Sequence, residues 1–78
     1  MTTKRETIIS TADDIQDVAM KSCYFDCEKA VRLICKGIDE RKGDEIADEL
    51  LEYWCAPGDA LMAIAHRAAV KRWNKENV

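Results

Sequence analysis

The stretch KSCYFDCEKAVRLICKG, residues 21–37, holds three of the four cysteines of this 78-residue chain. It also lies within a helical repeat of apolar side chains. At about 100° per residue, these side chains fall on one stripe and charged residues take the opposite side. The stripe consists of Ala12, Ile15, Ala19, Cys23, Cys27, Ala30, Leu33, Ile34 and Ile38. The pattern predicts one long amphipathic helix over about residues 11–42, ended by Gly43.

The cysteines allow two interpretations. Reduced cysteine packs as a small apolar side chain, and the positions of Cys23 and Cys27 on the stripe favour a place in the core. The alternative is a zinc site, in which Cys55 and His66 would complete the ligand set begun by Cys23 and Cys27. We expect no redox role, because the chain has no C-x-x-C motif and cysteines four apart on a helix have poor geometry for a disulfide.

Two sets of capping residues compete for the start of the long helix. Thr11 with Asp14 forms one capping-box pattern, and Thr3 with Glu6 forms an earlier one. We therefore expect residues 1–10 to be an N-terminal segment that either stays outside the helices or forms a short extra one.

Two further helices follow the long one. Asp44 is a capping residue for a helix over residues 44–55, and Asp59 is one for a helix over residues 59–75. The chain contains only three glycines and one proline, whereas a β-rich domain needs frequent turn residues. These features predict an all-α fold, a small three-helix bundle that forms a single domain over residues 1–78.

The last predicted helix opens with ALMAIA, residues 60–65, which is apolar on every side. Such a helix is covered on more than one side, and we expect a chain of this length to need a second copy for that cover. The sequence therefore predicts a helical homodimer. Its expected interface residues are Leu61, Met62, Ile64, Ala65, Ala68 and Trp73.

Charge is distributed unevenly over a chain whose net charge is −3. Residues 42–56 carry one basic and five acidic residues. The helical spacing predicts one acidic row made of Glu45, Asp48, Glu49 and Glu52. This row is either an ordinary solvated face or an imitation of a phosphate backbone, able to occupy the basic groove of a nucleic-acid-binding enzyme.

Two apolar residues stand on the otherwise charged side of the long helix. Val18 and Phe25 are seven positions apart and would form a small exposed patch. The alternative is that Ile8 and Ile9 of the N-terminal segment fold over and cover them.

The sequence contains no recognisable catalytic motif. It has no Gly-rich phosphate loop, HExxH, GxSxG or EF-hand pattern, and its one histidine, His66, has only Asp26 as a conceivable orienting carboxylate. Specific DNA binding is disfavoured, because a recognition helix needs polar residues in its first turns and residues 60–65 provide none. We expect no enzyme activity and no cofactor.

The location and function follow from the same observations. The N-terminal residues 1–11 are polar, and the longest apolar run in the chain is far too short for a membrane span, so we expect a cytoplasmic protein with reduced thiols. We expect a small regulatory or inhibitory protein-interaction module, of a size that bacteria and bacteriophages commonly encode. The alternatives are the acidic nucleic-acid mimic and the zinc-stabilised helical module.

Overall fold

The computed structural model describes residues 2–54 and 56–77. These residues form four helices: α1 (Lys4–Ser22), α2 (Cys27–Ile38), α3 (Gly43–Tyr53) and α4 (Pro57–Glu76). No strand occurs in these two ranges, so the predicted all-α class is confirmed for the described chain.

The long helix expected over residues 11–42 is two helices, α1 and α2, joined by a tight turn at residues 23–26. The helix ends because Tyr24 and Phe25 adopt left-handed backbone conformations, with φ of 51° and 71°. A new helix begins because the Asp26 carboxylate accepts a hydrogen bond from the Lys29 backbone amide, at 3.2 Å. The bundle therefore has four helices where the sequence pattern predicted three.

The start of α1 also differs from the preferred expectation, since the earlier of the two capping boxes is the one used. The Thr3 hydroxyl accepts from the Glu6 amide at 3.2 Å, and the Glu6 carboxylate accepts from the Thr3 amide at 3.3 Å. The expected N-terminal segment over residues 1–10 is therefore mostly the first two turns of α1.

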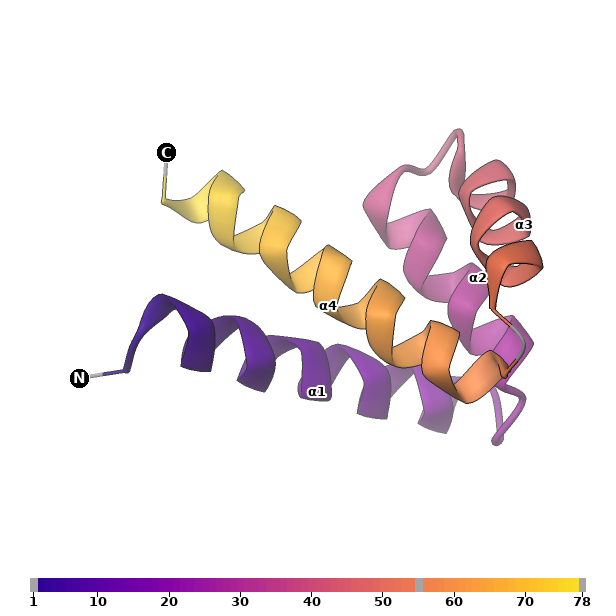
Figure 1. Ribbon diagram of the computed structural model, residues 1–78, viewed down its shortest axis with the longest axis horizontal. Helices are drawn as coiled ribbons and strands as arrows, with labels where there is room; N and C mark the ends of the chain where they lie inside the picture. The colour runs from indigo at the N-terminus through magenta and orange to yellow at the C-terminus, as the bar shows by residue number, and fades with distance from the viewer. Residues whose placement is uncertain (1, 55, 78) are drawn as a thin grey trace.

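Helix α4 is the central element of the fold. It runs antiparallel to α1, and α2 crosses the same helix while α3 packs mainly on α2 (Figure 1). The first turn of α1 and the last turn of α4 lie at one end of the molecule, and the α1–α2 and α3–α4 connections lie at the other (Figure 1). We call this second end the connection end.

The core is built largely from small side chains. Seven of the thirteen buried apolar residues are alanines, and the largest fully buried side chains are Leu61, Ile64, Val31 and Cys35. Alanines let helix axes approach closely, but each buries little apolar area. The chain exposes 5842 Å², whereas a compact monomer of its 8.9 kDa mass is expected to expose about 4,800 Å².

Four of the six residues in the apolar opening of α4 are buried without a second chain, which corrects the expectation that this segment needs one for its cover, although Met62 stays 59% exposed. Ala60, Leu61, Ile64 and Ala65 are at most 2% exposed within the single chain. The reason is the turn at residues 23–26, because it gives α4 two long neighbours, α1 and α2, in place of one.

Gly37 of α2 and Gly43 of α3 differ in whether the fold requires a glycine at that position. A Cβ on Gly43 would lie 2.7 Å from the Lys36 Cα, so at Gly43 the close approach of α3 to α2 requires glycine. A Cβ on Gly37 would meet nothing within 4 Å. Gly43 thus begins α3 at a point of close approach and does not end the preceding helix as expected.

We predict opposite effects for alanine at these two positions. Gly43→Ala should lower the free energy of unfolding by about 1–3 kcal/mol, because backbone atoms must move to admit the methyl group. In the monomer, Gly37→Ala should raise it by about 0.5–1 kcal/mol, because alanine favours the helix and no atom of the same chain occupies the space. Urea denaturation of the two variants tests this, and equal effects at both positions would contradict the described packing of α2 on α3.

Candidate protein-interaction surface

The α1–α2 turn places two aromatic side chains in solvent. The turn is closed by backbone bonds from the Phe25 amide to the Met20 carbonyl, at 3.3 Å, and from the Asp26 amide to the Cys23 carbonyl, at 3.0 Å. Tyr24 is 88% exposed and Phe25 is 86% exposed. A left-handed conformation costs a residue with a Cβ about 1 kcal/mol or more, and no packing of these two rings offsets that cost.

The α3–α4 connection adds two more aromatic residues at the same end. Tyr53, the last residue of α3, is 86% exposed, and Trp54 is 41% exposed. Both connections lie at the connection end of the molecule (Figure 1). We call Tyr24, Phe25, Tyr53 and Trp54 together the aromatic surface.

The aromatic surface contains four of the five aromatic residues of the chain. The fifth, Trp73, is half-buried and packs against the core. Aromatic side chains normally supply the largest share of buried apolar area in a small core. Here they are placed outside, while alanines fill the inside.

The two apolar residues expected to form one exposed patch are both exposed but lie on different surfaces. Val18, 62% exposed, is on the side of α1, and Phe25 is in the turn that follows. Ile8 is buried within α1 and Ile9 is 44% exposed, so these residues belong to the start of the same helix as Val18. The sequence pattern placed Val18 and Phe25 on one patch only because we assumed a continuous helix through residues 23–26.

The described cysteines all carry free thiols and lie at different depths. Cys35 is fully buried, and burial raises the pKa of its thiol. Cys23 and Cys27 are half-buried beside the turn, where the Cys27 thiol approaches the Met20 sulfur at 3.9 Å.

The proposed zinc ligands do not form a described cluster. Within residues 2–54 and 56–77, no three His, Cys, Asp or Glu side chains are grouped as metal ligands would be. Cys55 lies outside the described residues. His66 is exposed on α4, and Asp26, its conceivable partner, instead caps α2 and lies 4.0 Å from the Lys29 ammonium.

The acidic row is exposed on α3 as predicted from its spacing, but a basic residue balances part of it. The Arg32 guanidinium lies 2.7 Å from Asp48 and 3.9 Å from Asp44, and its hydrogen bond with Asp48 raises the pKa of Arg32. In the described chain, no ion pair involves the other members of the row, Glu45, Glu49 and Glu52.

The expected interface on the last helix is divided between core and surface. Leu61, Ile64 and Ala65 are buried by the chain's own helices, so in this conformation they cannot contact a partner. Met62 is 59% exposed, and Ala68 and Trp73 are half-buried.

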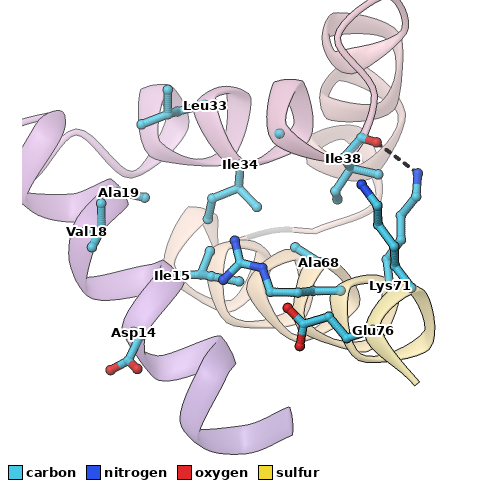
Figure 2. Close-up of a pocket in the computed structure, with 13 residues that line it drawn as sticks. Asp14, Ile15, Val18, Ala19, Leu33, Ile34, Ile38, Ala68, Lys71 and Glu76 are labelled. Carbon is cyan, nitrogen blue, oxygen red and sulfur yellow. Dashed lines mark hydrogen bonds between the residues drawn. The ribbon is translucent and has the colours of Figure 1, made fainter. Parts of the chain in front are cut away.

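A groove of about 790 Å³ lies where α1, α2 and the second half of α4 meet (Figure 2). Its apolar lining includes Ile15 and Val18 of α1 and Leu33 and Ile38 of α2, and α4 contributes a basic side. The Lys71 ammonium of α4 donates a hydrogen bond to the Ile38 carbonyl at 2.8 Å, which links α4 to the end of α2 (Figure 2).

Comparison with protein-family models, with curated proteins and with solved structures gives no significant match to this chain. Among the described residues, none of the helices has the length and apolar character needed to cross a membrane.

We predict that thiol reagents distinguish the described cysteines. In a Cys55→Ser background, Cys23 and Cys27 should react readily in the native protein. Cys35 should react only when the protein unfolds, because its thiol is buried, and burial also raises the pKa of this thiol and so lowers its reactive thiolate fraction. Mass spectrometry after timed alkylation measures this order. Modification of Cys35 as fast as Cys23 would contradict the described core.

Proposed function

We propose that this protein is a small, non-enzymatic regulatory or inhibitory module that binds another protein through the aromatic surface at its connection end. We further propose that it works in the cytoplasm as a homodimer. The observation that carries the binding proposal is the pair of exposed aromatic residues held in left-handed conformations, Tyr24 and Phe25.

The local backbone supports this proposal because stability alone does not account for the residues in the turn. Glycine or asparagine adopts the left-handed conformation at lower cost than tyrosine or phenylalanine. The rings of Tyr24 and Phe25 are almost fully in solvent, so they return little packing energy to the fold. Strained residues of this kind concentrate at functional positions.

The chemistry of the surface also fits protein binding. Tyrosine and tryptophan are enriched at interface hot spots, because a rigid ring buries a large area at a small entropic cost. Tyr24, Tyr53 and Trp54 offer such rings together with hydroxyl and indole groups that can hydrogen-bond. The α1–α2 turn that carries Tyr24 is closed by two backbone hydrogen bonds, which limits the ordering cost of binding there.

We predict that a turn variant separates stability from binding. Tyr24→Asn/Phe25→Gly should raise the free energy of unfolding by about 1 kcal/mol by relieving the left-handed strain. In affinity capture from the native host, the same variant should no longer retain the partner protein. Ile9→Ser is the matched control, since it removes an exposed apolar residue near the opposite end of the molecule.

Two outcomes would count against this function. One is a retained set of proteins that is identical for wild type and the turn variant. The other is an equal loss of those proteins with Ile9→Ser, which would indicate general stickiness and not a surface at the turn.

The acidic face of α3 supports a second candidate function, an acidic mimic that inhibits a nucleic-acid-binding enzyme. The favouring observation is that Glu45, Glu49 and Glu52 are exposed, with no ion pair in the described chain. Asp48 contributes less negative field, because Arg32 lies against it.

For this second function we predict that Glu49→Lys/Glu52→Lys abolishes inhibition of the target enzyme and changes the free energy of unfolding by less than about 0.5 kcal/mol. These positions avoid both the Arg32 ion pairs and the first turn of α3. The control variant, Asp13→Lys/Asp17→Lys, makes the same change in net charge on α1, at positions that do not line the groove. Inhibition that survives in the α3 variant, or falls equally in both, argues against mimicry.

A further inference from the structure

We infer that the groove between α1, α2 and α4 holds a second copy of this chain in a two-fold arrangement. This inference rests on the homodimer part of the proposed function and is independent of partner binding at the aromatic surface. It also moves the dimer contact away from the apolar opening of α4, where the sequence alone had placed it, because that segment is already covered.

The first support is the amount of surface that the single chain leaves exposed. Its 5842 Å² exceeds the area expected for a compact monomer of this mass by roughly 1,000 Å². A standard protein interface removes about 800 Å² from each partner. The excess area is therefore sufficient for one protomer's share of a stable dimer contact.

The second support is the apolar character of the groove and of its edges. Val18 is 62% exposed and Leu33 is 44% exposed, and both line the groove (Figure 2). Ile15 and Ile38, at its base, are only half-buried. These large aliphatic side chains, which come from α1 and α2, form an apolar lining that a second protein surface would remove from water.

The third support is Gly37, a glycine that the monomer does not require. It lies in the last turn of α2, lines the groove, and has no atom within 4 Å of the place where a Cβ would be. A glycine inside a helix makes the helix less stable than an alanine at the same position does. In the proposed dimer, a helix of the second copy crosses α2 at this position. The absence of a side chain at Gly37 then lets the two backbones approach closely.

The fourth support is the charge on the two sides of the groove. The α4 side carries Lys71, Arg72 and Lys75, with Glu76 as the one acidic residue among them. On the α1 side, the acidic residue that lines the groove is Asp14. A two-fold axis through the groove brings the basic side of one copy to the acidic side of the other, twice per dimer.

The first experiment measures molar mass by sedimentation equilibrium over a range of protein concentrations. Wild type should be a dimer, and Val18→Glu/Leu33→Glu should raise the dimer dissociation constant by about a hundredfold or more, because it places unpaired charge in the contact. Met62→Glu is the matched control, since Met62 is as exposed as Val18 but does not line the groove. It should remain dimeric.

The second experiment exchanges the charges. Asp14→Lys makes both sides basic, and Arg72→Glu/Lys75→Glu makes both sides acidic, so each variant alone should be a monomer. An equimolar mixture should form a heterodimer, because each contact then joins opposite charges. Lys71 is left unchanged, since it bonds the Ile38 carbonyl within the chain.

The results separate the groove from the rest of the proposed function. A monomeric wild type, a dimer that survives Val18→Glu/Leu33→Glu, or charge variants that fail to combine would each overturn the groove as the dimer contact. Loss of the partner protein from the turn variant Tyr24→Asn/Phe25→Gly tests the aromatic surface and does not depend on these outcomes.

Discussion

The turn at residues 23–26 is the constraint on which the rest of this structure depends. Without it, a straight helix over residues 11–42 would be about 48 Å long, whereas the longest extent of the molecule is 36 Å. The left-handed residues Tyr24 and Phe25 reverse the chain, and the Asp26 cap starts α2 in its new direction. One apolar stripe becomes two helices that fold against α4 from different sides.

The reversal explains the composition of the core. Helices α1 and α2 both pack on the opening of α4. Where three helices meet this closely, small residues such as Ala30, Ala60 and Ala65 are favoured. An alanine core gives limited apolar burial in a chain of this length. Four of the five aromatic side chains and several large aliphatic ones lie outside, on the aromatic surface and along the groove, where contact with other molecules can bury them.

The exposed features are separated on the molecule. The aromatic surface lies at the connection end, the groove lies between α1, α2 and the second half of α4, and the acidic row lies on α3 (Figures 1 and 2). This separation allows self-association and partner binding to occur together. The groove does not draw on the aromatic residues, and the turn does not contribute to the groove lining.

The sequence by itself determined the all-α class, the positions of α3 and α4 to within two residues, and the exposure of the acidic row. These follow from helical periodicity and scarce turn residues. The expected caps Asp44 and Asp59 lie inside α3 and α4, whose N-cap residues are Lys42 and Ala56. Both capping boxes were visible in the sequence, but choosing between Thr3 and Thr11 required knowing that Ile8, which lies between them, is buried in the core.

Only the tertiary structure decided that the long helix is broken, that α4 is covered by its own chain, and that a groove remains. The helical periodicity of apolar residues continues past residues 23–26. It does so because Cys23, at the start of the turn, and Ala30, after the turn, both pack in the core. Asp26, the one acidic residue within the stripe, was the available signal for a new helix start. The cap itself is a local bond to the Lys29 amide, but the packing of α1 and α2 on α4 favours a new helix over a continued one, and such packing leaves no mark on local spacing.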